Sequence, residues 1–285
     1  MVQIDPRIPF NLLNDTHGKQ PFSAQNWDGT LAAYSAKRIV AVIASPKSGS
    51  TYVSNVIGQH CKLPYKRLCY AYASNEHDLY LPALVTAKIT GGVSQLHMRA
   101  TPHNLQLIEA FDVKSIVLTR NIFDTLASFQ RDIKKKMSAQ IPGQGRLGYS
   151  FVWLMPHLLK LSDEQLMDYC IDFYVPWFLN FLASWNQCLN DERICFLRYE
   201  TLMESKPAVF ARIFELLGYE PNVSPDLLAT NFLENNKHIA AAGGKTGYGL
   251  DVLTAKQRAA IEQKFSYFDK ALAKEYMNFE PDSRF

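Results

Sequence analysis

The five cysteines of this 285-residue chain include no Cys-x-x-Cys pair, and their number is odd. A disulfide framework or a zinc cluster needs paired or clustered cysteines, so the sequence favours reduced thiols and no metal site. A strong excess of one charge is also missing. The 30 Lys and Arg residues against 27 Asp and Glu residues leave a net charge of +3, which is too small to indicate a nucleic-acid partner.

Long apolar runs are missing as well. No uninterrupted apolar stretch reaches membrane-spanning length, and residues 1–6 lack the basic start and apolar run of a secretion signal. The chain contains no internal repeat and no low-complexity tract. We therefore expect a cytoplasmic protein without a membrane span, in which 47% hydrophobic residues supply a substantial core.

Apolar, β-branched runs alternate with helix-compatible segments along the chain. Strands are expected at residues 39–44, 113–119 and 194–197. This alternation is typical of an α/β fold in which helices flank a central parallel sheet. Ligands of such sheets bind at the carboxyl ends of the strands, so the segments that follow these runs are candidates for a site.

The most informative segment follows the first expected strand. Residues 45–51 read Ser-Pro-Lys-Ser-Gly-Ser-Thr and lead into a helix-compatible stretch. Such a turn presents backbone N–H groups, the positive end of a helix dipole and a fixed cation to one anion. The segment therefore predicts a site for a phosphate or a sulfate. The alternative is an ordinary turn in which Ser and Thr residues cap the helix.

A second segment repeats the order of strand, anion turn and helix. The run 113–119 leads into Arg120, and Ser128 follows two helical turns onward on the same face. An arginine at the carboxyl end of a strand suits a fork-like hold on a phosphate. The alternative pairs Arg120 with Asp124 in a local salt bridge, but the repeated pattern favours an anion site.

Residues 46–52 resemble the first motif of the cytosolic-type sulfotransferases that use 3′-phosphoadenosine 5′-phosphosulfate (PAPS). That motif reads roughly Pro-Lys-Ser/Ala-Gly-Thr-Thr-Trp and binds the 5′-phosphosulfate; here Ser50 replaces threonine and Tyr52 replaces tryptophan. Residues 120–128 are similar to the second motif, roughly Arg-Asn-Pro-Lys-Asp with a serine four residues after the aspartate, which binds the 3′-phosphate. The resemblance extends from about residue 39 to about residue 265.

The resemblance implies a single P-loop-like α/β domain at residues 37–285, after an irregular lead-in at residues 1–36. It also implies in-line transfer of a sulfuryl group from PAPS to a hydroxyl of a small or lipid-like acceptor, which leaves adenosine 3′,5′-bisphosphate (PAP). His97, in Gln95-Leu96-His97 where the family has Lys-Thr-His, would be the general base. Lys47 would stabilise the bridging oxygen. His103 is the second candidate for the base.

The remaining cofactor contacts are also implied by the resemblance. Tyr199 and Phe232 fall in segments that contact the adenine in the family, and Gly244 and Lys245 fall in the glycine-rich loop that closes over the 3′-phosphate. The expected cofactor-binding residues are Lys47, Ser48, Gly49, Ser50, Thr51, Tyr52, Arg120, Ser128, Tyr199, Phe232, Gly244 and Lys245.

Two departures from the family pattern remove positive charge. Gln95 replaces a lysine, and Ala242 and Gly243 replace an Arg-Lys pair. A charge-assisted contact contributes roughly 1.5 to 3 kcal/mol, so a non-catalytic PAP binder stays an alternative. A P-loop nucleotide kinase or NTPase is another, although the Walker glycine spacing is missing. The dimer motif of many cytosolic members is not recognisable at residues 250–262, so no oligomeric state is predicted.

Two further regions have alternative interpretations. Residues 134–148, where three lysines precede proline and glycine, predict a solvated helix end and a surface loop; a lid over the acceptor is the alternative. The aromatic-rich region 151–185 predicts core packing, and the alternative is that part of it lines an apolar acceptor pocket. These aromatic residues favour a hydrophobic alcohol or phenol as acceptor.

Overall fold

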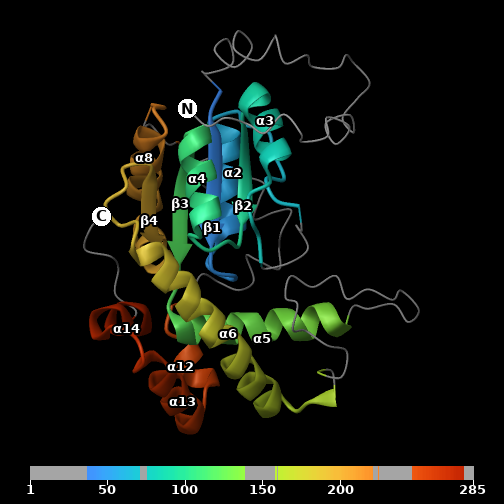
Figure 1. Ribbon diagram of the computed structural model, residues 1–285. Helices are drawn as coiled ribbons and strands as arrows, with labels where there is room; N and C mark the ends of the chain where they lie inside the picture. The colour runs from blue at the N-terminus through green and yellow to red at the C-terminus, as the bar shows by residue number, and fades with distance from the viewer. Residues whose placement is uncertain are drawn as a thin grey trace.

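A four-stranded parallel sheet forms the centre of the protein (Figure 1). The computed structural model describes residues 37–70, 76–138, 158, 160–220, 224 and 246–278. The strands are β1 (Ile39–Ala44), β2 (Gly92–Leu96), β3 (Val113–Thr119) and β4 (Ile194–Arg198). Their spatial order is β2-β1-β3-β4. The α/β fold class expected from the sequence is confirmed.

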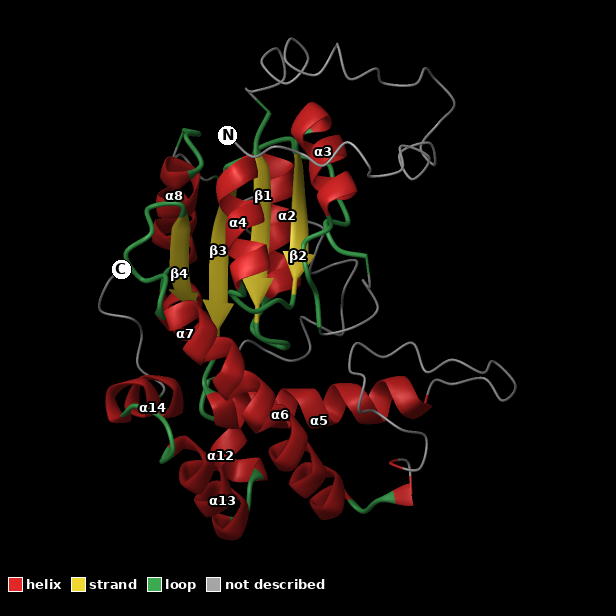
Figure 2. Cartoon of the chain, viewed as in Figure 1, coloured by secondary structure: helices red, strands yellow, loops and turns green. Residues whose placement is uncertain are grey.

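Helices cover both faces of this sheet (Figure 2). Their bounds are α2 (Ser50–His60), α3 (Leu81–Thr90), α4 (Pro102–Phe111), α5 (Ile122–Ser138), α6 (Asp163–Asn186), α7 (Tyr199–Glu204), α8 (Lys206–Leu216), α12 (Gly249–Val252), α13 (Ala255–Phe265) and α14 (Lys270–Met277). Ser162 and Thr254 begin α6 and α13 with capping boxes, in which each hydroxyl accepts from a backbone N–H three residues later.

The alternation of β1 divides the core into two clusters. Ile39, Ala41 and Ile43 pack in a cluster with α3, α4, α5 and α6, whereas Val40 and its alternate neighbours pack with α2 and α8. Every residue of β1 is buried. A strand buried on both faces reads as a continuous apolar run, which explains why the sequence predicted its bounds correctly.

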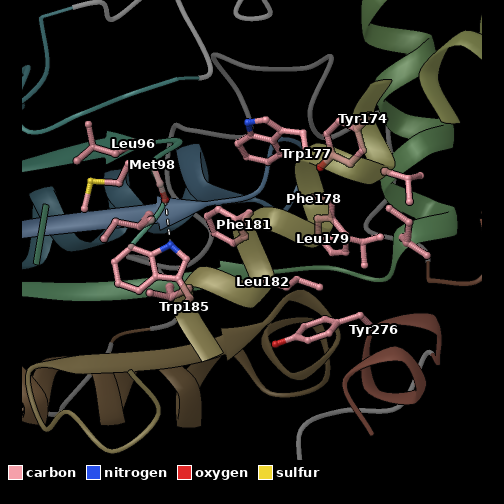
Figure 3. Packing of buried hydrophobic residues seen from close by; sticks show 14 of the residues in the cluster. Leu96, Met98, Tyr174, Trp177, Phe178, Leu179, Phe181, Leu182, Trp185 and Tyr276 are labelled. Atoms are coloured by element: carbon pink, nitrogen blue, oxygen red, sulfur yellow. Dashed lines mark hydrogen bonds between the residues drawn. The ribbon is translucent and has the colours of Figure 1, made fainter. Parts of the chain in front are cut away.

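The long helix α6 supplies the aromatic part of the larger cluster (Figure 3). Tyr174, Phe178 and Trp185 are buried there, and the indole N–H of Trp185 donates to the carbonyl of Met98 at 2.9 Å. Burial of an indole is favourable when its N–H finds such a partner. Core packing, the first interpretation of the aromatic-rich region, is confirmed for these residues, while Phe173 is 44% exposed.

The strands at 39–44 and 113–119 match the expected ranges, and β4 extends one residue beyond its expected end. β2 had not been predicted. Lys134 and the two lysines after it belong to the last turns of α5. Residues 1–36 and 139–148 lie outside the described residues. Among the described helices, none has both the length and the apolar character that a bilayer span requires.

Candidate functional site

Each of the four strands leads directly into a residue of the predicted site. Ser45 follows β1, His97 follows β2, Arg120 follows β3 and Tyr199 follows β4. All four arrowheads point toward the same end of the sheet, where α5 and α6 lie (Figure 2). In a sheet of order 2-1-3-4 the topological switch point lies between β1 and β3, and open α/β sheets bind ligands there. The two predicted anion segments flank this point.

The turn after β1 has a backbone conformation that few residues tolerate. Lys47 and Gly49 have φ angles of 70° and 89°, both in the left-handed region. A Cβ on Gly49 would lie 3.1 Å from the ring of Tyr199, so this position also lacks room for a side chain. The hydroxyls of Ser45 and Ser48 lie 2.5 Å apart across the turn. The turn leads into α2 at Ser50, which puts a helix N-terminus beside it.

Helix α6 holds this turn from the core. The hydroxyl of Tyr174 donates to the carbonyl of Pro46 at 3.1 Å, and the tyrosine is fully buried. Burial raises the pKa of Tyr174, with a smaller opposing effect of its hydrogen bond with Ser45, so the phenol stays protonated and able to donate. The sequence had placed Tyr174 in the aromatic-rich region, as a packing residue or part of an acceptor pocket, and not as a hydrogen-bond donor to the turn. The signal that was available is that a buried phenol needs a hydrogen-bond partner.

Lys47 lies against helix α5. Its Nζ is 3.3 Å from Oδ1 of Asp132, and the two side chains are 30% and 22% exposed. Asp132 is one helical turn after Ser128 on α5. The backbone carbonyl of Lys47 accepts from Nη1 of Arg120 at 3.3 Å. The structure therefore brings the two predicted anion segments into contact.

Arg120 is 6% exposed, and its guanidinium contacts Tyr199, Tyr248 and Asp124 in addition to that carbonyl. Its guanidinium carbon lies 4.2 Å from the centroid of Tyr199 and 5.7 Å from that of Tyr248, and Nη2 lies 3.5 Å from Oδ2 of Asp124. The local pair of Arg120 with Asp124, given above as an alternative, is therefore present. It occurs together with the contact to the first anion segment and does not replace it.

Asp124 ties this cluster to the segment after the glycine-rich loop. Its Oδ1 accepts from the N–H of Gly249 at 2.7 Å, and its Oδ2 accepts from the N–H of Gly247 at 2.9 Å. The carboxylate is fully buried. The sequence had assigned no such role to Asp124. Nothing local could have shown it, because its partners lie more than a hundred residues away in the chain.

Asn121 caps the start of α5. Its Oδ1 accepts from the N–H of Phe123 at 2.9 Å, and its own N–H donates to the buried carboxylate of Glu200 at 3.0 Å. Glu200 follows β4, so this bond joins the ends of two neighbouring strands. The cap thereby fixes the direction in which α5 leaves the sheet and the place of Ser128 on it.

His97 is bound through its ring and its backbone. Its Nδ1 lies 2.8 Å from the carbonyl oxygen of Ala44, the last residue of β1. Because a carbonyl only accepts, this contact assigns the proton to Nδ1 and the lone pair to Nε2. The N–H of His97 donates to Nδ1 of the buried His77 at 2.8 Å, a contact that the sequence did not indicate. His103 contacts the carbonyl of Leu79 through Nε2 at 3.1 Å.

The remaining predicted residues near the first anion segment make contacts of different kinds. Thr51 donates its hydroxyl to Oε1 of Gln95 at 3.0 Å, so Gln95 contacts the anion turn. Ser50 is buried at the start of α2, and the ring of Tyr52 packs edge-to-face on Phe210, with centroids 5.8 Å apart. Burial raises the pKa of Tyr52 to about 12. Tyr52 is thus placed as a packing residue beside α8.

Tyr199, a predicted adenine contact, and Ser128, a predicted phosphate contact, both lie within the described part of the chain. Burial raises the pKa of Tyr199, and Arg120 opposes this effect. Ser128 is half-buried, and its hydroxyl makes no hydrogen bond within the residues that the structure describes. The predicted residues Phe232, Gly244 and Lys245 lie outside the described residues, as do Ala242 and Gly243.

A profile of the sulfotransferase domain matches residues 37–279. The chain belongs to the sulfotransferase domain family. Sulfuryl transfer is therefore the reaction class of this sulfotransferase, and the resemblance stated from the two motifs is confirmed. A comparison with the curated proteins finds no match.

Solved structures of other sulfotransferases share the fold. The mouse sulfotransferase SULT7A1 complexed with PAP has a TM-score of 0.57 at 15% identity, over 91% of this chain and 98% of that chain. Retinol dehydratase in complex with androsterone and PAP has a TM-score of 0.47 at 14% identity, over 85% of each chain. Sulfotransferase STF9 from Mycobacterium avium has a TM-score of 0.43 at 14% identity, over 86% and 81%. The mouse structure identifies the fold of this sulfotransferase.

Proposed function

We propose that this sulfotransferase transfers the sulfuryl group of PAPS to a hydroxyl of a small or lipid-like acceptor, with His97 as general base. One observation carries the proposal: the carbonyl that ends β1 holds Nδ1 of His97 at 2.8 Å, directly before the anion turn that contains Lys47. The same strand end therefore positions a basic Nε2 and presents a cation. Acceptor activation and sulfuryl stabilisation need these two groups side by side.

The described residues fit a nucleotide that carries phosphates at the 3′ and the 5′ position of its ribose. Two anion segments meet at the β1/β3 switch point through the contact of Arg120 with the carbonyl of Lys47. Gly49 carries no side chain, and a Cβ at this position would lie 3.1 Å from the ring of Tyr199. A glycine here permits the close approach of a ligand to the backbone of the turn. The mouse sulfotransferase of the same fold is complexed with PAP, which supports this cofactor class.

When bound, PAPS supplies the sulfuryl group and leaves as PAP. The protein contributes placement and charge stabilisation, as in phosphoryl transfer. Nε2 of His97 accepts the proton of the acceptor hydroxyl, which is the role that its tautomer permits. Lys47 stabilises negative charge at the 5′ end, and Arg120 with Ser128 holds the 3′-phosphate.

Lys47 has to exchange one anion for another to act in this way. Its pair with Asp132 is partly exposed, and such pairs contribute about 0 to 1 kcal/mol. A hydrogen bond to a charged group such as a phosphate contributes roughly 1.5 to 3 kcal/mol. The balance favours transfer of the lysine from Asp132 to the nucleotide.

Aromatic side chains of α6 support an apolar acceptor. Tyr174 joins this helix to the anion turn, and Trp177 packs beside it with a centroid separation of 5.9 Å. Tyr169 and the exposed Phe173 stack at 4.4 Å one turn earlier. This arrangement supports a phenol or a hydrophobic alcohol as the acceptor. The domain bounds of 37–285 and the cytoplasmic location stay predictions.

The test is transfer of labelled sulfuryl from PAPS to a panel that contains a phenol, a steroid-like alcohol, a lipid alcohol and a carbohydrate. His97→Gln should lower kcat by about two to four orders of magnitude and leave PAP affinity unchanged. His103→Gln is the matched control and should stay within a few-fold of the natural protein. PAP binding with no turnover on any acceptor would indicate a non-catalytic binder, and equal kcat in both variants would exclude His97 as the base.

A further inference from the structure

Arg131 lies on the face of α5 that carries the predicted phosphate serine. Asp124, Ser128 and Arg131 are spaced by four and three residues, so they share one helix face. Arg131 is exposed, and within the described part of the chain it makes no ion pair with a carboxylate. Its Nη2 instead donates to the hydroxyl of Tyr248 at 2.9 Å. Arg131 therefore has N–H donors beyond the one that Tyr248 uses, and it lies one helical turn from the Ser128 hydroxyl, which makes no hydrogen bond within the described residues.

Tyr248 brings this arginine close to Arg120. The guanidinium carbons of Arg120 and Arg131 lie 5.7 Å and 5.2 Å from the centroid of the same tyrosine ring. The Tyr248 hydroxyl also donates to the carbonyl of Asp124 at 2.9 Å, which fixes the ring at the start of α5. Two guanidinium groups therefore lie against one ring, and Ser128 lies on the same face of α5 as Arg131. This arrangement suits a multivalent anion.

The charge balance of the site also requires a second cation. Arg120 already pairs with the buried Asp124, so these two groups together carry no net charge. A phosphate monoester carries about −1.5 to −2 at neutral pH. Lys47 pairs with Asp132 and belongs to the other anion segment. Among the described cations on this face of α5, Arg131 supplies the charge that Arg120 alone lacks.

We propose that Arg131 is a third ligand of the 3′-phosphate of the cofactor, with Arg120 and Ser128, and that it sets the preference for the 3′-phosphorylated nucleotide. This proposal rests on the proposed function, because it takes PAPS as the cofactor. It also explains how the site replaces the charge lost at Ala242 and Gly243. In this proposal α5 supplies a positive charge in addition to that of Lys245, the lysine predicted in the glycine-rich loop.

The test is calorimetric titration of the full chain with PAP and with AMP, which lacks the 3′-phosphate. Arg131→Gln should weaken PAP binding by about 10- to 150-fold, as expected for loss of a charge-assisted contact, and leave AMP binding unchanged. Arg131→Lys, which keeps the charge and loses the fork, should give an intermediate value. AMP affinity also reports whether the variants keep the folded site.

Two control variants separate ligation from other effects. Lys256→Gln removes an exposed cation from α13 and should leave the ratio of PAP to AMP affinity unchanged. Tyr248→Phe removes the hydroxyl that Arg131 contacts but keeps the guanidinium, so it should change this ratio by no more than a few-fold. If Tyr248→Phe reproduces the whole effect of Arg131→Gln, Arg131 acts by holding the tyrosine, and the proposal is overturned.

The failure of this proposal and that of the proposed function give different results. A natural protein that prefers PAP over AMP, with the same preference in Arg131→Gln, overturns the role of Arg131 alone. A natural protein that shows no preference for PAP overturns the proposed function and the role of Arg131 together.

Discussion

Replacement of Asp124 by asparagine would remove the charge of a fully buried carboxylate that three groups share. Its two oxygens accept from the N–H groups of Gly247 and Gly249 at 2.9 and 2.7 Å, and Oδ2 lies 3.5 Å from Nη2 of Arg120. Asparagine has one acceptor oxygen and one NH₂ donor. One of the two backbone N–H groups would therefore face another donor, and Arg120 would lose its counter-charge.

The expected magnitude follows from these contacts. Removal of one partner from a buried ion pair destabilises a protein by about 3 to 5 kcal/mol. A buried N–H group without an acceptor costs about 1 to 3 kcal/mol, but this loss overlaps with the first because the same oxygen serves both. We therefore expect Asp124→Asn to lower the free energy of unfolding by about 3 to 5 kcal/mol.

Urea denaturation followed by circular dichroism measures this change. Asp112→Asn is the matched control, since the carboxylate of Asp112 is 62% exposed and pairs with Lys114 at 3.0 Å on the surface. The control should change the free energy of unfolding by less than about 1 kcal/mol. A loss in Asp124→Asn no larger than that in the control would refute the view that this carboxylate holds Gly247, Gly249 and Arg120 together.

Three further changes have defined outcomes. Gly49→Ala should lower the free energy of unfolding, measured by urea denaturation, more than Gly247→Ala does. Both glycines have a φ of 89°, but only a side chain at position 49 would meet a neighbour, the ring of Tyr199 at 3.1 Å. Equal losses in the two variants would contradict this explanation. Tyr174→Phe should lower stability by about 1 to 3 kcal/mol and weaken PAP binding, unlike Tyr267→Phe at an exposed position. Burial raises the pKa of Cys170 to about 12. The free energy of unfolding should therefore fall between pH 9 and pH 12, by up to about 1.4 kcal/mol per pH unit. In Cys170→Ala this fall should be less steep.

The pH prediction follows from which state binds the proton. The folded protein keeps the Cys170 thiol protonated up to about pH 12, while the unfolded chain releases this proton near pH 9. Between these values the unfolded state binds fewer protons, so rising pH favours unfolding. Below pH 9 both states are protonated and the thiol contributes no pH dependence.

The sequence predicted the strands whose residues are mainly apolar or β-branched, namely β1, β3 and β4. Every residue of β1 is buried, and every residue of β3 except Lys114 is buried, so their apolar and β-branched residues were sufficient to locate them. β2 was missed because its five residues, Gly92–Leu96, include glycine, serine and glutamine. Its burial comes from pairing with β1, and composition alone does not record that pairing.

The groups that hold the site in place could not be predicted from local pattern. Tyr174 lies 128 residues from the carbonyl to which it donates, and Asp124 lies 125 residues from Gly249. Spacing rules describe neighbours on one helix or strand, not partners across the fold. Gln95 is a further example. The sequence indicated only that a positive charge is missing at this position, whereas the structure shows that Gln95 accepts a hydrogen bond from Thr51.

The most direct test of the central claim is calorimetric titration of the natural protein and of Arg120→Ala with PAP, AMP and ATP with magnesium. The account predicts metal-independent binding of PAP that requires the 3′-phosphate and is lost in the variant. Preference for ATP with magnesium, or equal affinity for PAP and AMP in the natural protein, would contradict a PAPS site at the β1/β3 switch point.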